Sequence, residues 1–117
     1  MIVLKSDQVA SFDCDETLVM WYTPFFKDQD TIKIQTNNDL AYVYPHLKHI
    51  EELKNHKARG HKIIVWSRGG YEWATAIVEA LQLTNYVDLV ACKPLYFWDD
   101  LTPNEVFTRY YKNVSKS

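Results

Sequence analysis

Two short apolar runs, each stopped abruptly by polar residues, constrain this sequence most. The first spans Val9 to Phe12, and the second spans Lys62 to Trp66 in the stretch KIIVW. Apolar runs of this length, bounded by polar residues, are typical of strands that a parallel sheet covers on both faces. Segments with helical spacing follow both runs. This alternation predicts an α/β fold with a mainly parallel sheet flanked by helices.

The helices are marked by apolar stripes and by end signals. Pro45 suits the first position of a helix, and Gly60 suits the residue after its last turn. A second stripe follows Gly70, and Thr102 with Glu105 forms a capping box for a final helix. The apolar positions of the three expected helices are Leu47, Ile50 and Leu53, then Ala74, Ile77, Val78 and Leu81, and finally Val106, Phe107 and Tyr110. The stretches VDLVA and LYFW between the last two helices are short candidate strands.

Residues 19–44 separate the first strand from the first helix. Two β-prone runs there flank Asn37 and Asn38, a dipeptide suited to a hairpin turn. The aromatic residues that precede the hairpin, candidates for substrate contact or for packing onto the sheet, are Trp21, Tyr22, Phe25 and Phe26. This segment is too short for an inserted domain. We therefore expect one domain over residues 1–117, with residues 19–44 forming a loop and a β-hairpin flap.

The composition argues against several classes of protein. Hydrophobic residues make up 47% and charged residues 24%, as in soluble globular proteins. The net charge of −2 gives no basic surface for a nucleic-acid backbone. No apolar run approaches the length of a membrane span, and Cys14 and Cys92 are not spaced as a metal knuckle. We expect a cytoplasmic protein with reduced cysteines, with no membrane partner and no indication of nucleic acid.

Polar clusters follow each of the four expected strands. They are Asp13 and Asp15, then Ser67 and Arg68, then Lys93, and finally Asp99 and Asp100. Ligands of open α/β folds bind beyond the carboxyl ends of the strands. We therefore expect these side chains to meet at one edge of the sheet.

The acidic residues suggest a divalent cation. Asp13 and Asp15 are two positions apart, so in an extended segment both carboxylates point the same way and repel each other unless a cation lies between them. Mg²⁺ takes one or two carboxylates and keeps water for its remaining positions. Asp99 and Asp100, from another strand end, can complete such a shell. For Asp13 alone, an acid that merely ends a strand is a competing interpretation.

The remaining polar residues suggest a phosphate. Ser67 precedes a helix, and backbone N–H groups beside a hydroxyl form a seat for an anion; a simple N-cap is the alternative. Lys93 is a candidate cation for phosphate oxygens, with surface lysine as the alternative. Arg68 is a second candidate that we do not prefer to Lys93.

Taken in order, the stretches SFDCDETL, KIIVWS, CKP and FWDD resemble the four motifs of the haloacid dehalogenase-like phosphatases. The resemblance runs from Phe12 to Asp100, nearly the whole chain. It implies a Rossmann-like three-layer sandwich without a cap domain. An uncapped site suits a large phosphorylated substrate, or closure by another copy of the chain in a homo-oligomer.

The resemblance also implies a Mg²⁺-dependent phosphatase that hydrolyses a phosphomonoester. Asp13 would attack phosphorus and form an aspartyl-phosphate. Asp15 would protonate the leaving oxygen and later activate water. The metal ligands implied are Asp13, Asp15 through its carbonyl, Asp99 and Asp100. The phosphate-binding residues implied are Ser67 and Lys93, with Arg68 as a further candidate.

Two features depart from the family pattern. Glu16 stands where the family most often has glycine. Only residues 94–98 separate Lys93 from Asp99, whereas neighbouring parallel strands need a crossover of about a dozen residues. Either one of the two candidate strands is very short, or Lys93 reaches the site from a loop.

Other functions compete with this one. A catalytically silent module that binds a phosphorylated or protein partner is the alternative from another class, and phosphotransferase or phosphomutase action is a rival within the same chemistry. A cysteine-dependent phosphatase is excluded because no arginine stands six residues beyond Cys14 or Cys92. The glycines of a nucleotide-binding loop are absent. His46 and His49 are expected on the solvated face of a helix.

Overall fold

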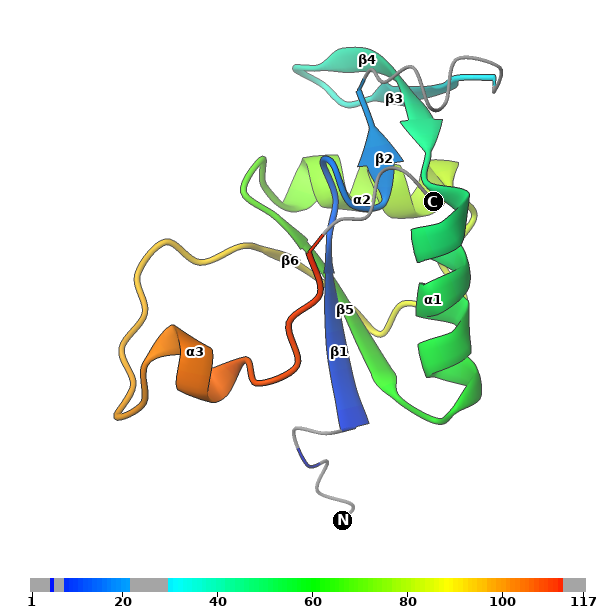
Figure 1. Cartoon of the computed structure of the whole chain (residues 1–117). Coiled ribbons are helices and arrows are strands. Elements are labelled where there is room, and N and C mark those ends of the chain that lie inside the picture. The colour runs from blue at the N-terminus through cyan, green and yellow to red at the C-terminus, as the bar shows by residue number, and fades with distance from the viewer. Residues whose placement is uncertain (1–4, 6–7, 22–29, 113–117) are drawn as a thin grey trace.

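A computed structural model describes residues 5, 8–21 and 30–112 of the chain (Figure 1). Its elements in chain order are β1 (Val9–Asp13), β2 (Val19–Met20), β3 (Ile32–Gln35), β4 (Leu40–Pro45), α1 (Leu47–Ala58), β5 (Lys62–Ser67), α2 (Tyr71–Ala80), β6 (Leu89–Cys92) and α3 (Pro103–Val106). Tyr22, Phe25 and Phe26 lie outside the described residues. Within the described part, no helix is both long enough and apolar enough to cross a lipid bilayer.

The central sheet has three parallel strands in the order β1-β5-β6. This confirms the strands predicted from the two apolar runs and from VDLVA. The register places Asp13 opposite Trp66, and Ser67 opposite Cys92. The last residues of all three strands therefore lie close together at one edge of the sheet.

Helices α1 and α2 cover one face of this sheet. In the strand order β1-β5-β6, the connection from β1 to β5 and the connection from β5 to β6 both move toward the same edge of the sheet. Connections between parallel strands are right-handed, so the helices in these two connections lie on the same face. The burial pattern agrees, because Ile63 and Val65 of β5 are fully buried in one core with apolar residues of both helices. On the other face Trp66 is half-buried, and its ring meets Phe107 with 6.3 Å between ring centroids. Figure 1 shows α1 and the single turn α3 on opposite sides of β1.

The predicted hairpin is confirmed. Strands β3 and β4 pair antiparallel around the turn from Thr36 to Asp39, and β2 pairs with the other edge of β4. The Thr36 N–H donates to the Asp39 carbonyl at 2.9 Å, and the Asn38 N–H donates to Thr36 Oγ1 at 3.3 Å. Strand β3 contacts α2, so the hairpin lies over the end of the sheet where β1 stops (Figure 1).

The first helix begins later than predicted, at Leu47 instead of Pro45. Pairing with Val19 keeps Pro45 in strand β4, and His46 becomes the N-cap. The prediction of a surface histidine is wrong for His46, which is fully buried and whose Nδ1 accepts the His49 N–H at 3.2 Å. The two imidazole rings stack with 3.6 Å between their centroids. Because histidine is polar, a buried imidazole that caps a helix does not appear in the pattern of apolar residues from which burial is predicted.

The other helix-end signals give mixed results. Gly60, with φ of 87°, follows the last turn of α1 as predicted. The capping box at α3 is present, with the Thr102 N–H donating to Glu105 Oε2 at 3.1 Å. The predicted extension of this helix to Tyr110 is wrong. The chain leaves helical geometry at Phe107, the residue whose ring packs against Trp66.

The prediction of a strand over LYFW is also wrong. Residues 94–101 form no helix or strand, and Leu95, Tyr96 and Trp98 are mostly exposed. Only Lys93 and Pro94 separate this stretch from the end of β6, which is far too few residues for a crossover to another parallel position. Pro94 has no N–H with which to continue the ladder of β6.

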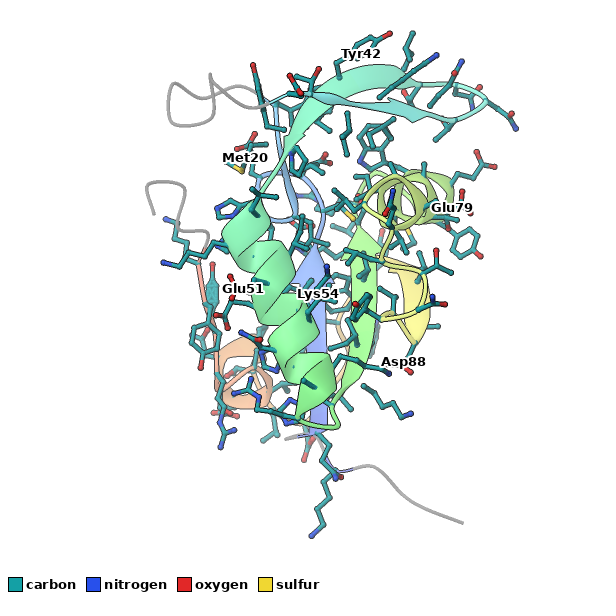
Figure 2. All side chains as sticks on the ribbon, turned by 90° about the vertical axis from the view of Figure 1, so that its right-hand side faces the viewer. Met20, Tyr42, Glu51, Lys54, Glu79 and Asp88 are labelled. Atoms are coloured by element: carbon teal, nitrogen blue, oxygen red, sulfur yellow. The ribbon has the colours of Figure 1, made fainter. Side chains whose placement is uncertain are left out.

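Asp88 ties three elements together at the other end of the sheet, before β6. Figure 2 shows Asp88 well away from Tyr42 of the hairpin. The Asp88 carboxylate accepts two hydrogen bonds from Lys57 Nζ at 2.9 and 3.0 Å and one from the Ile63 N–H at 2.8 Å. Lys62 Nζ lies 3.7 Å away. Burial acts to raise the pKa of Asp88, but the hydrogen bonds and the two lysines outweigh it and hold the pKa below its ordinary value.

Candidate functional site

Asp13, Ser67 and Lys93 come together at the carboxyl edge of the sheet. The Lys93 N–H donates to the Ser67 carbonyl at 2.8 Å, one step past the register pair of Ser67 and Cys92. From there Lys93 Nζ reaches to 3.8 Å from Asp13 Oδ1. Lys93 directly follows the four-residue strand β6. A carboxylate, a hydroxyl-bearing residue and a cation are thus gathered as the sequence predicted.

Ser67 is 1% exposed, and its hydroxyl oxygen accepts the Gly69 N–H at 2.9 Å. The hydroxyl proton is left for another acceptor. The simple N-cap interpretation does not hold, because the N-cap of α2 is Gly70, with φ of 106°. A Cβ at Gly69 would lie 3.2 Å from Ser67 Oγ and 3.2 Å from Trp73 Cδ1, so a glycine permits this close approach.

Asp15 is held by two tryptophans. Its Oδ1 accepts the indole N–H of Trp21 at 3.0 Å and that of Trp73 at 3.1 Å. The two rings stack with 6.0 Å between their centroids and 14° between their planes. Both indole N–H groups donate to Oδ1. Asp15 Oδ2 accepts no hydrogen bond from the residues that the structure describes. Sequence reasoning missed Trp73, which lies 58 positions from Asp15 and looks locally like a core residue of α2.

The turn after β1 orients Asp15 relative to Asp13. The N–H groups of residues 17–19 all donate to the Cys14 carbonyl, and the Glu16 N–H donates to the Val19 carbonyl at 2.8 Å. Glu16 adopts φ of 61°, a left-handed conformation in which glycine is the least strained residue. The backbone at Glu16 therefore has the shape that a glycine would take most easily.

Cys14 lies between the two aspartates but is not a nucleophile. It is fully buried, and burial, followed by the charges of Asp13 and Asp15, raises the pKa of its thiol to about 12. The thiolate is the reactive form of cysteine, so a thiol with this pKa is inert near neutral pH. The exclusion of a cysteine-dependent phosphatase therefore agrees with the environment of Cys14.

The structure does not bring Asp99 and Asp100 to this cluster. Both are exposed, and Asp99 accepts the Leu101 N–H at 3.0 Å, which with hydrogen bonds from Asp100 lowers the pKa of Asp99. Figure 1 shows the segment between β6 and α3 running away from the carboxyl end of β1. Among the described residues, no group of three or more His, Cys, Asp or Glu side chains could hold a metal ion. The predicted four-acid set is not assembled. Arg68 is exposed beside Ser67 and has no ion pair to a described residue.

A cleft of about 220 Å³ opens beside Asp15. Its walls are the two indoles of Trp21 and Trp73, the backbone at Gly69, and the start of β4 at Leu40 and Ala41, with Asp39 at the hairpin end. The cleft therefore runs from Asp15 and Gly69 to the hairpin flap, and Asp13, Ser67 and Lys93 do not line it.

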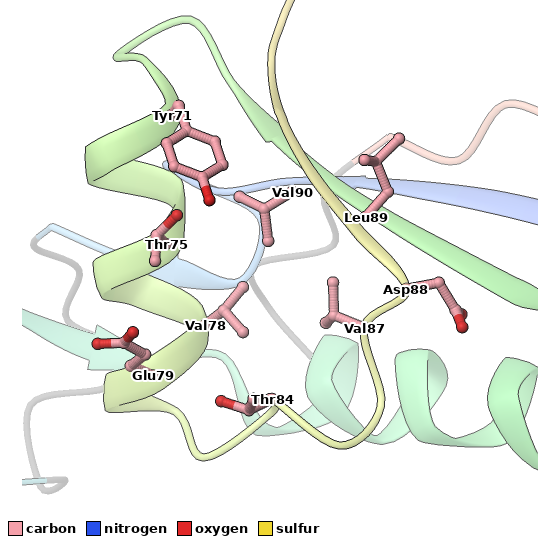
Figure 3. Close-up of a pocket in the computed structure, with 9 residues that line it drawn as sticks. All are labelled: Tyr71, Thr75, Val78, Glu79, Thr84, Val87, Asp88, Leu89 and Val90. Carbon is pink, nitrogen blue, oxygen red and sulfur yellow. The ribbon is translucent and has the colours of Figure 1, made fainter.

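A second groove of about 140 Å³ lies between α2 and β6 (Figure 3). Figure 3 shows Val78, Val87 and Val90 pointing into it, with Glu79 and Asp88 at its rim. Thr75, which also lines it, has a buried hydroxyl without a hydrogen-bond partner among the described residues. Two carboxylates and no cation make this groove unsuited to phosphate.

No family model matches the sequence, and the comparisons with curated proteins and with solved structures gave no match. Asp13, Ser67 and Lys93 form one cluster, Asp15 is positioned next to it by two indoles, and Asp99 and Asp100 lie apart.

Proposed function

We propose that this chain is a haloacid dehalogenase-like phosphatase, in which Asp13 takes the phosphoryl group from a phosphomonoester. The observation that carries the proposal is the cluster of Asp13 with Lys93, whose charged atoms are 3.8 Å apart, beside the buried Ser67. A carboxylate nucleophile that attacks a phosphate dianion needs a nearby cation and hydrogen-bond donors for the equatorial oxygens. Lys93 and Ser67 supply both.

The proposed reaction has two steps. In the first, a carboxylate oxygen of Asp13 forms a bond to phosphorus while the bond from phosphorus to the leaving oxygen breaks, and Asp15 gives its proton to that oxygen. In the second, water attacks the aspartyl-phosphate, Asp15 takes a proton from the water, and inorganic phosphate leaves. Asp15 Oδ2 is the atom suited to these proton transfers, because both indoles occupy Oδ1.

The backbone adds support. The resemblance places a glycine most often at the position of Glu16, and Glu16 adopts the left-handed conformation that favours glycine. The parallel sheet flanked by helices is compatible with the Rossmann-like three-layer sandwich that belongs to the proposal. The open carboxyl edge suits a phosphorylated small molecule or macromolecule, and closure by a second copy of the chain is part of the same proposal.

Mg²⁺ dependence also belongs to the proposal, although the described site holds only part of the implied ligand set. Asp13 offers a carboxylate at the end of β1, whereas Asp99 and Asp100 lie on an exposed segment. The four-acid set therefore does not fit the described arrangement, and neither step above depends on it. A bound Mg²⁺ would supply additional neutralisation of the phosphate charge.

A catalytically silent module that binds a phosphorylated partner is the second candidate. The separation of Asp99 and Asp100 from Asp13 favours it, because such a module needs the phosphate-binding residues Ser67 and Lys93 but no complete metal site. The two candidates differ in whether Asp13 is phosphorylated and then dephosphorylated by water.

The test is hydrolysis of p-nitrophenyl phosphate with Mg²⁺ and with a chelator, by the wild-type chain, by Asp13→Asn and by Asp30→Asn. Asp30 is an exposed aspartate outside the site and serves as the matched control. We expect Mg²⁺-dependent turnover that Asp13→Asn abolishes and Asp30→Asn leaves unchanged. Phosphate binding without turnover in the wild type would support the silent module instead.

A further inference from the structure

The cleft that Trp21 and Trp73 help to line is placed where a leaving group would lie, which extends the proposed function to a class of substrate. It begins at Asp15 and Gly69 and reaches the hairpin at Leu40. Gly69 also contacts Ser67, one of the two proposed phosphate-binding residues, because its N–H donates to Ser67 Oγ at 2.9 Å. A phosphate held by Ser67 and Lys93 therefore has this cleft on the side of Asp15, the residue that would protonate the leaving oxygen.

Trp21 provides the indole surface that a ligand in the cleft can reach. Trp73 is 6% exposed and its ring stacks against that of Trp21, whereas Trp21 is 46% exposed. The start of β4 at Leu40 and Ala41 lines the cleft opposite the sheet edge. Flat indole faces bind planar groups by stacking, and the apolar area that they bury contributes most of the affinity.

The size of the cleft matches a single ring. Its volume is about 220 Å³, and a cavity of about 150 Å³ lined by apolar residues is large enough to bind benzene. The cleft offers no cation to an anionic group. Apart from Asp15, the proposed proton donor, its one charged lining residue is Asp39, and no Lys, Arg or His lines it among the described residues. An anionic leaving group would be repelled, because like charges a few ångströms apart disfavour one another.

We propose that this cleft is the leaving-group subsite of the phosphatase, and that it takes a planar, uncharged moiety such as an aromatic ring. The inference rests on the proposed function, since a leaving group exists only if a phosphoester is cleaved. It goes further by selecting among phosphomonoesters: aromatic alcohols are preferred to small aliphatic ones, and carboxylated alcohols are disfavoured.

The test compares three phosphoesters of primary alcohols, so that differences in leaving-group acidity stay small: benzyl phosphate, ethyl phosphate and 2-phosphoglycolate. We expect kcat/KM for benzyl phosphate to exceed that for ethyl phosphate by about tenfold or more, since even one methylene in an apolar pocket gives about tenfold. We expect 2-phosphoglycolate to be the poorest of the three. These ratios are measured on the wild-type chain and do not depend on how a variant folds.

A matched pair of variants places the effect in the cleft. Asp39 and Asp30 are both exposed aspartates, but only Asp39 lines the cleft. Asp39→Asn should raise kcat/KM for 2-phosphoglycolate relative to ethyl phosphate about threefold, and Asp30→Asn should leave this ratio unchanged.

The possible outcomes separate the two proposals. Equal kcat/KM for benzyl and ethyl phosphate, or a preference for 2-phosphoglycolate, overturns the subsite and leaves the phosphatase standing. A discrimination against 2-phosphoglycolate that Asp39→Asn does not reduce, or that Asp30→Asn reduces equally, overturns the location. No hydrolysis of any of the three esters overturns the phosphatase and the subsite together.

Discussion

Replacing Lys93 by alanine separates its proposed chemical role from its contribution to stability. Lys93 Nζ lies 3.8 Å from Asp13 Oδ1, and the two side chains are 35% and 34% exposed. Ion pairs with this exposure contribute only about 0.2–1 kcal/mol to folding, because water screens the charges and ordering the side chains costs entropy. We therefore expect Lys93→Ala to lower the free energy of unfolding by less than about 1 kcal/mol.

The effect on catalysis should be much larger. If Lys93 neutralises charge that develops on the transferring phosphoryl oxygens, removing it should lower kcat/KM by about 10²–10³-fold, equivalent to about 2.7–4 kcal/mol of transition-state stabilisation. The ground-state ion pair with Asp13 cannot account for a loss of that size. The ratio of the two effects is thus the quantity to measure.

Lys62 provides a matched control. Its Nζ lies 3.7 Å from Asp88 Oδ1 and its side chain is 49% exposed, so its ion pair resembles that of Lys93 in distance. It lies at the first residue of β5, at the opposite end of the sheet from the site. Lys62→Ala should cost a similar small stability and leave the hydrolysis of p-nitrophenyl phosphate unchanged.

Both variants are measured by urea denaturation and by steady-state kinetics. The reasoning is refuted if Lys93→Ala retains kcat/KM within about threefold of the wild type, since one lost oxyanion donor should cost far more. It is also refuted if Lys62→Ala reduces activity as strongly as Lys93→Ala does.

The remaining predictions concern stability and thiol reactivity. Asp88→Ala should lower the free energy of unfolding by about 2–3 kcal/mol in urea denaturation, because it leaves the Ile63 N–H without its acceptor and removes the ion pair; a loss below about 0.5 kcal/mol would contradict this. The pKa of Asp88 is lower in the folded state, so its stabilisation is complete above about pH 4 and is lost as the pH falls through the folded-state pKa. Wild-type stability should therefore fall below about pH 4 more steeply than that of Asp88→Ala, and parallel pH curves would contradict this. With a thiol reagent near neutral pH, the exposed Cys92 should react in the native protein and the buried Cys14 only after unfolding, as labelled peptides would show; equal labelling would contradict the assignment.

The sequence predicted the features that depend on local patterns. The apolar runs ending at Asp13 and Ser67 became neighbouring parallel strands, and Asn37 with Asn38 became the turn of a hairpin. Each of these signals lies within a few residues of the structure that it specifies. Because parallel strands end at one edge, the strand assignments predict that Asp13 and Ser67 meet. The short spacing between Lys93 and Asp99 leaves open whether Lys93 joins them, and the structure places Lys93 Nζ 3.8 Å from Asp13 Oδ1.

The missed features depend on contacts between distant segments. Trp73 donates to Asp15 across 58 positions, and no local pattern distinguishes such an indole from an ordinary core residue. His46 is buried as a helix cap, which an apolar stripe cannot reveal. The strand expected before Asp99 failed because a β-prone composition does not provide a partner edge, and Pro94 carries the chain away from β6.

The most direct measurement is to trap the phosphorylated enzyme. The chain is mixed with a phosphoester, quenched in acid within the first turnover, digested and analysed by mass spectrometry. A phosphoryl group on the peptide that contains Asp13, removed by hydroxylamine and absent in Asp13→Asn, is the predicted result. Turnover with no phosphorylated Asp13 at any quench time, or with the phosphoryl group on another residue, would contradict the account.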